Sequence, residues 1–130
     1  MNVPDWMNDT VRGFGRQLGL STLALNERGA AGVRFDNGTA LRLERTDGAL
    51  TVFVTVAGQP SGEALRTLLA EAHPAAGGGR RRVVRAACSL RTGEALLAVR
   101  IGERDVGVTS LSDAFHDLWE RAERIRRAIG

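Results

Sequence analysis

The chain has 130 residues, 43% hydrophobic and 25% charged, a composition that excludes extensive disorder and suits one globular domain over residues 1–130. A single cysteine, Cys88, excludes an internal disulfide and a paired-cysteine zinc site, which indicates a reducing compartment. No apolar run approaches the ~18 residues of a membrane span, and the first residues lack a secretory signal pattern, so we expect a cytoplasmic protein. All 18 basic residues are arginine, but a net charge of +3 is too weak to predict nucleic-acid binding by itself.

The first predicted element is a helix over residues 5–18 that ends at Gly19, a suitable C-cap. Its apolar positions follow the 4-3-4 spacing of one helical face: Met7, Val11, Phe14 and Leu18. Gly13 and Gly15 inside this helix each cost up to about 1 kcal/mol relative to alanine. We therefore expect the helix to depend on packing against the rest of the domain.

Short alternating apolar runs follow, separated by turn residues, and they predict a meander of antiparallel strands. The runs are residues 22–26, 32–36, 39–45 and 50–57. Asn37-Gly38 between the second and third runs is a strong hairpin signal. The last run is apolar on both faces, so we expect it to be the most buried.

The second half begins with a helix from Ser61 to about residue 72 and continues, after a flexible connection over residues 75–82, with two more strands. These strands are predicted over residues 83–90 and 95–101, and a short strand is predicted over residues 106–109. Ser110 and Asp113 form a capping-box pattern at the start of a last helix. That helix has one apolar face, made of Leu111, Phe115, Leu118, Trp119, Ala122, Ile125 and Ile129.

The element order, α-β-β-β(-β)-α-β-β(-β)-α, predicts an α+β fold with a mainly antiparallel sheet and three helices. No residue pattern in it predicts chemistry. The two histidines, His73 and His116, have no spacing typical of a metal site or a catalytic pair, and Cys88 is predicted to be a buried, inert thiol. We therefore predict no enzyme activity, no metal and no cofactor.

Residues 14–44, FGRQLGLSTLALNERGAAGVRFDNGTALRLE, resemble the opening of class I type III secretion chaperones. The resemblance is carried by a helix that ends in F-x-x-x-L-G-L, a following Leu-x-Leu-(Asp/Asn), and a Phe-Asp turn after a small-residue strand. The matching residues are Phe14, Leu18, Gly19, Leu20, Leu23, Leu25, Asn26, Phe35 and Asp36. The length, the element order and the closing helix also look like that family.

The resemblance implies a homodimer in the bacterial cytoplasm that binds the extended N-terminal segment of a secreted effector and is not an enzyme. Members of the family are usually acidic, whereas this chain is basic, which suggests an acidic effector segment. The candidate effector-binding residues are Leu20, Leu23, Leu25, Val33, Phe35, Leu41 and Leu43. The candidate dimer-interface residues, surplus apolar side chains of the second helix and a late strand, are Leu65, Leu68, Leu69, Leu97 and Val99.

Periodicity alone does not distinguish the effector-binding set from plain core beneath the first helix. Two other functions therefore stay open. One is a regulatory module of the same fold that sequesters a transcription regulator or another chaperone. The other, less favoured, is a small nucleic-acid-binding protein that uses Arg80, Arg81 and Arg82.

Overall fold

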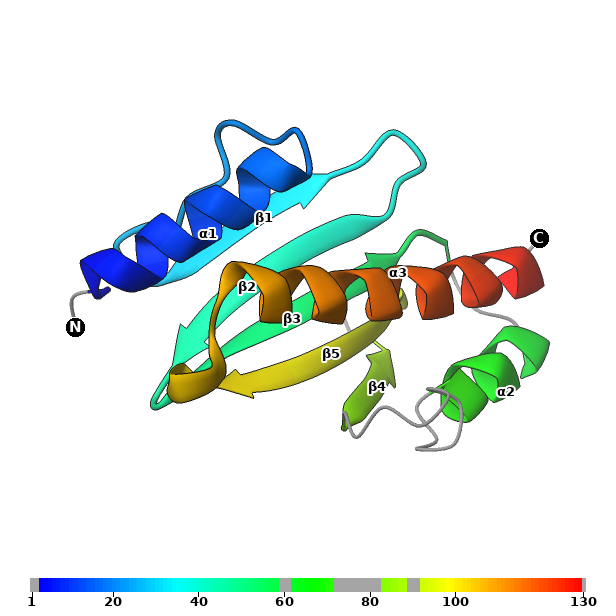
Figure 1. The fold of residues 1–130 in the computed structure, drawn as a ribbon. Helices are drawn as coiled ribbons and strands as arrows, with labels where there is room; N and C mark the ends of the chain where they lie inside the picture. The colour runs from blue at the N-terminus through cyan, green and yellow to red at the C-terminus, as the bar shows by residue number, and fades with distance from the viewer. Residues whose placement is uncertain (1–2, 59–61, 72–82, 89–91, 130) are drawn as a thin grey trace.

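Five antiparallel strands form one sheet in the order β1-β2-β3-β5-β4 (Figure 1). The computed structural model describes residues 3–58, 62–71, 83–88 and 92–129. The strands are β1 (Ala30–Arg34), β2 (Ala40–Thr46), β3 (Ala49–Val56), β4 (Val84–Cys88) and β5 (Ala95–Gly102). The helices are α1 (Asp5–Gln17), α2 (Gly62–Glu71) and α3 (Val108–Ile129), with a 3-10 turn at Glu103–Asp105. The predicted α+β fold class is confirmed.

The two faces of the sheet differ because side chains alternate along each strand. In β3 the residues on one face are fully buried, namely Leu50, Val52, Val54 and Val56, while Thr51, Phe53 and Thr55 on the other face are half-buried. Helices α1 and α3 lie on the buried side, which we call the inner face, and α2 lies beside α3 and β4 (Figure 1). Within the described residues, no helix covers the opposite side, which we call the outer face.

The two glycines inside α1 lie where other segments come close. A Cβ on Gly15 would lie 2.7 Å from the carbonyl oxygen of Leu20 and 2.9 Å from the Cβ of Leu23. A Cβ on Gly13 would lie 3.1 Å from the Cγ2 of Val108 in α3. Glycine lowers the helix propensity at both positions, but it allows the neighbouring segments to approach α1 closely. This agrees with a helix that depends on packing.

Two predicted strands are wrong. Residues 22–26 form no strand, because the N–H of Leu25 donates to the side-chain oxygen of Asn8 in α1 (3.0 Å) instead of joining the ladder. Residues 106–109 form no strand either, because α3 already begins at Val108. The predicted capping box is also wrong, since Ser110 lies inside the first turn of α3, where its Oγ accepts from the N–H of Gly107 (2.8 Å).

Two side chains differ in burial from what their residue types predict. Cys88 is exposed rather than buried, because it ends β4 at the edge of the sheet. Arg121 is 2% exposed in α3 and its Nε donates to Asp117 Oδ1 at 2.9 Å. A buried arginine requires such a partner, since an unpaired buried charge is strongly unfavourable.

Candidate functional site

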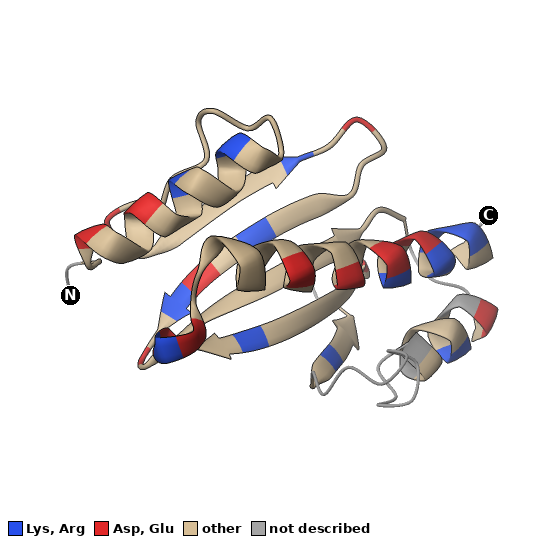
Figure 2. Ribbon diagram, viewed as in Figure 1, with Lys and Arg blue, Asp and Glu red and all other residues tan. Residues whose placement is uncertain are grey.

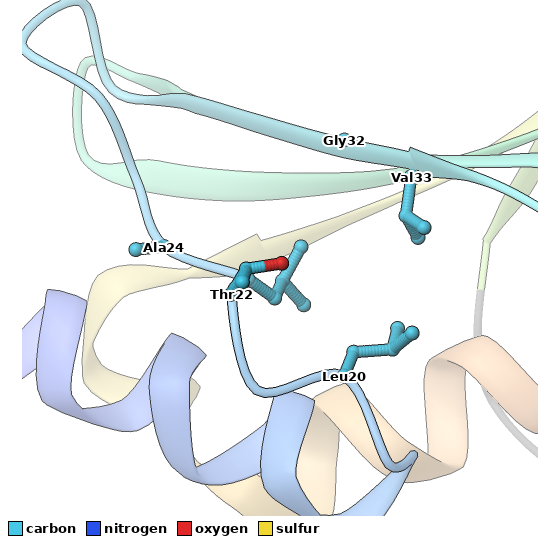
Figure 3. Close-up of a pocket in the computed structure, with 6 residues that line it drawn as sticks. Leu20, Thr22, Ala24, Gly32 and Val33 are labelled. Carbon is cyan, nitrogen blue, oxygen red and sulfur yellow. The ribbon is translucent and has the colours of Figure 1, made fainter.

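A shallow pocket lies between the segment after α1 and the first strand (Figure 3). It is lined by Leu20, Thr22, Leu23, Ala24, Gly32 and Val33. Its volume is about 80 Å³, well below the several hundred Å³ typical of small-molecule sites. The pocket therefore has room for one small side chain, and four of its six lining residues are apolar.

The wall of this pocket is held against α1 by short contacts. The N–H of Leu20 donates to the carbonyl of Gly15 at 2.7 Å, and that of Leu25 donates to Asn8. Leu23 is 4% exposed, so its side chain belongs to the core as well as to the pocket. The segment over residues 20–25 thus runs beside β1 without pairing with it, which leaves the pocket open between them.

The backbone of β1 has an open edge beside the pocket. The N–H of Phe35 donates to Thr39 (2.8 Å) and that of Arg45 to Gly29 (2.7 Å), so odd-numbered residues of the first strand bond to β2. Even-numbered residues therefore point their N–H and C=O groups away from β2. Those of Ala30 bond to Asn26, whose side-chain oxygen accepts the N–H and whose own N–H donates to the carbonyl. The open edge consists of Gly32 and Arg34.

The predicted effector-binding residues divide by their accessibility. Leu20, Val33 and Phe35 are half-buried; Leu20 and Val33 line the pocket, whereas Phe35 packs on the aromatic rings of α3. The others lie in the core, where they support this surface from beneath: Leu23, Leu25, Leu41 and Leu43. A partner that touches the folded chain would meet the first group.

Aromatic side chains fix the turn between β1 and β2 on α3. Phe35 lies 5.0 Å from Trp119 and 6.1 Å from Phe115, measured between ring centroids. In the same turn, Asn37 Nδ2 donates to Glu123 Oε1 at 3.4 Å. Glu123 also pairs with Arg126 and thereby raises the pKa of that guanidinium. The open end of β1 is therefore anchored to α3.

The opposite edge of the sheet, at β4, has a different character. The N–H of Glu103 donates to the carbonyl of Gly48 (2.9 Å), so odd-numbered residues of β5 bond to β3 and even-numbered ones bond to β4. The register then makes Arg85 and Ala87 the residues of β4 that bond to β5. The residues of β4 that direct backbone groups away from β5 are Val84, Ala86 and Cys88. Val83, just before β4, is 73% exposed.

The candidate dimer-interface residues near this edge differ in how exposed they are. Leu65 in α2 is 40% exposed, whereas Leu68 is 3% exposed. The side chain of Leu69 lies outside the described residues. Leu97 and Val99 point to the inner face and are buried under the helices, while their neighbours Leu96 and Ala98 lie on the outer face.

The described part of the chain holds no group of three or more His, Cys, Asp or Glu side chains that could bind a metal ion. His116 is exposed, and its Nδ1 lies 2.7 Å from the Ser112 carbonyl oxygen one turn earlier in α3. His73 and Arg80, Arg81 and Arg82 lie outside the described residues. Among the described helices, none is both long and apolar enough to cross a membrane.

Comparison with known proteins finds a matching family and several similar folds. Residues 10–126 match the model of the Tir chaperone protein (CesT) family. A chain of the ExsC-ExsE complex superposes with a TM-score of 0.79 at 20% identity, covering 99% of this chain and 97% of that one. For a chain of the HopA1-SchA chaperone-effector complex the TM-score is 0.71 at 21% identity, covering 97% and 100%.

A third similar structure is that of the Yersinia pestis type III secretion chaperone SycH in complex with a stable fragment of YscM2. There the TM-score is 0.67 at 19% identity, covering 92% of this chain and 98% of that one. A sequence search of curated proteins finds no match. At these identities the structural likenesses establish the fold, and the family match covers most of the chain.

Proposed function

This chain belongs to the Tir chaperone protein (CesT) family, and we propose that it binds the extended N-terminal segment of a type III secreted effector and keeps that segment competent for secretion. The proposal places the protein in the bacterial cytoplasm as a binding protein without catalytic activity, metal or cofactor. Two of the similar folds come from complexes of such chaperones, one with an effector and one with a protein fragment.

One observation carries the proposal: the open backbone of Gly32 and Arg34 lies directly beside the pocket lined by Leu20 and Val33. An extended peptide that adds to a sheet edge gains main-chain hydrogen bonds, and every second side chain enters a pocket. The open edge and the pocket supply both requirements within one strand. The residues proposed to contact the effector are Leu20, Val33 and Phe35, with Leu23 forming the base of the pocket.

We also propose a homodimer through β4 and α2. The edge of β4 presents apolar residues, with Val83 and Cys88 exposed, and Leu65 of α2 adds a further exposed apolar side chain. A two-fold dimer requires one self-complementary patch, and a sheet edge satisfies this by pairing with its own copy. Of the predicted interface residues, the accessible Leu65 is the one we assign to direct contact.

The test is to recover the tagged protein from its native cytoplasm and identify what co-purifies. We expect a type III secreted effector whose N-terminal segment resists proteolysis while bound. Recovery of a transcription regulator or another chaperone instead would favour the regulatory module. Recovery of nucleic acid, with binding that weakens steeply in salt, would favour the nucleic-acid reading.

Single substitutions then locate the surface. Val33→Asp and Leu20→Asp each remove an apolar contact worth roughly 1.5–3 kcal/mol, so effector binding should weaken by about one to two orders of magnitude. The matched control is Leu41→Asp, which buries an unpaired charge and should unfold the domain. If the Val33 and Leu20 variants stay folded and bind the effector unchanged, this surface is not the binding site.

A further inference from the structure

The strands of the sheet carry charge of mainly one sign. Their basic residues are Arg34, Arg42, Arg45, Arg85 and Arg100, and their acidic residue is Glu44. Acidic positions gather instead on the helices and turns (Figure 2). The alternation places Arg34, Arg42 and Glu44 on the outer face, whereas Arg45 points to the inner side and pairs with Glu103 at 3.1 Å.

These charges are ordered along the first strand. Arg34 lies at the open end of the edge, where its Nη1 donates to the Gly38 carbonyl at 3.0 Å. That bond occupies one of five N–H donors of a guanidinium. Glu44 lies opposite Ala30, which is the residue that Asn26 already caps. Asp36 follows in the turn beyond the strand. The open edge therefore carries the positive charge of Arg34, with the negative charge of Glu44 beside the closed part and that of Asp36 in the turn beyond the strand.

Gly32 extends this positive edge toward the second strand. Because Gly32 has no side chain, Arg42 of β2 lies alongside it, with Cγ 3.3 Å from where a Cβ would be. Arg42 also pairs with Glu44, and its side chain is 60% exposed. A side chain on an added strand opposite Gly32 would meet Arg42, although the pair with Glu44 makes this second contact the weaker one.

From this geometry we infer that the edge selects a particular alternation in its client: an apolar residue with an acidic residue next to it. This inference rests on the proposed function. A client residue opposite Val33 points to the inner side and into the pocket. Its neighbour opposite Arg34 points to the outer face, where cross-strand partners lie about 4.5–5.5 Å apart between Cβ atoms. The other neighbour, opposite Gly32, favours acid more weakly through Arg42.

The experiment is selection of a phage-displayed library of random 12-residue peptides on the full-length chain. Three variants accompany it: Arg34→Glu, Gly32→Pro and Arg100→Glu. Gly32→Pro removes an N–H that points away from β2 and no hydrogen bond of the ladder, so it closes the edge. Its added Cβ, 3.3 Å from Arg42 Cγ, requires a small shift of that flexible side chain. Arg100→Glu is the matched charge control, because it changes the net charge equally on the outer face of β5, three strands or roughly 14 Å from β1.

We expect the wild-type chain to enrich peptides with Asp or Glu next to an apolar residue. A synthetic copy of such a peptide should bind Arg34→Glu roughly three- to tenfold more weakly, and a Lys in place of its acid should restore that binding. Arg100→Glu should leave the affinity unchanged at about 0.1 M salt, where the screening length is about 10 Å.

Two results would overturn the inference alone. These are enriched peptides that need an open Gly32 edge but show no acidic preference, and equal weakening by Arg34→Glu and Arg100→Glu, which would reveal a general charge effect. If no peptide is enriched, or if Gly32→Pro changes nothing, the edge is not a binding site. The proposed surface then fails together with the inference.

Discussion

The two edges of the sheet solve the same problem in different ways. Any edge strand presents unpaired backbone groups that invite another chain. At β1 the outward-facing backbone groups are those of Gly32 and Arg34, because Asn26 already bonds to the backbone of Ala30. The open end also carries a charged residue, Arg34. At β4 the outward-facing residues are Val84, Ala86 and Cys88, with exposed Val83 before them. The short, charged β1 edge fits the reversible binding of a client peptide that we propose, and the longer, apolar β4 edge fits the proposed dimer contact.

The largest expected effect is the loss of the dimer when the β4 edge is changed and the β1 edge is left intact. Ala86→Pro removes an N–H that points away from β5, so each copy should fold while the β4 edge loses a donor. The lost bond costs each copy about 1–3 kcal/mol and counts twice in a two-fold dimer. The dimer dissociation constant should therefore rise by about two orders of magnitude or more.

Light scattering at micromolar concentration measures this change. The wild-type chain should have about twice the 13.9 kDa mass of one copy, and the variant should approach the mass of one copy. A wild-type chain that scatters as a single copy would refute the dimer. A variant that stays dimeric would move the interface away from the β4 edge.

The second prediction is the reciprocal change at β1. Gly32→Pro should abolish capture of the co-purified effector segment, since the edge loses one of its two outward N–H groups and the ring blocks the approach of a strand. The dimer should persist. Val33→Pro is the matched control, because its N–H points to β2 and its loss should destabilise the ladder itself. Pull-down and thermal melting of both variants measure the contrast, and equal melting losses would show that the alternation is misassigned.

The third prediction concerns the wall of the pocket. Gly15→Ala forces a Cβ to within 2.7 Å of a backbone oxygen and 2.9 Å of Leu23, so it should destabilise the fold by about 1–3 kcal/mol and weaken effector binding. A Cβ at Gly13 meets no backbone atom; it lies 3.1 Å from Val108 Cγ2, which must shift by a few tenths of an ångström, and about 1 kcal/mol of helix propensity offsets that strain. The melting temperature of Gly13→Ala should stay nearly unchanged. A Gly15→Ala variant as stable as wild type would show that the wall is soft.

The smallest effect uses Cys88 as a reporter of the second edge. Its side chain is exposed in one copy, so a maleimide should label it severalfold faster in the Ala86→Pro variant than in the wild-type dimer. Equal rates, with the dimer confirmed by light scattering, would place Cys88 outside the interface.

The sequence predicted the sheet well because its alternation and glycine turns are local signals. The five strands begin within two residues of their predicted starts, and the last helix begins at Val108, ahead of its predicted cap at Ser110. Residues 22–26 were mispredicted because Leu23 and Leu25 alternate as in a strand. What decides their structure is a distant side chain, Asn8, which takes the backbone donor that a ladder would use. Local periodicity carries no information about such a competitor.

The candidate effector-binding residues remain a prediction, and the structure only divides them by burial. No sequence pattern separates Val33, at the pocket, from Leu41, which is fully buried behind it. Arg34 and Gly32 were not singled out, because their role depends on which backbone groups point outward. The burial of Arg121 was missed for a similar reason, since charged residues are almost never fully buried unless paired.

The cap of Asn26 on Ala30 has a consequence for how tightly a client is held. Two open residues offer at most four hydrogen bonds, worth about 0.5–1.5 kcal/mol each, and binding any segment costs several kcal/mol of lost freedom. One edge alone therefore gives weak, quickly reversible capture. In a dimer, a single client that reaches both edges raises its own effective concentration at the second one, so avidity supplies the strength. Such a client leaves one site at a time, because each site alone holds it only weakly.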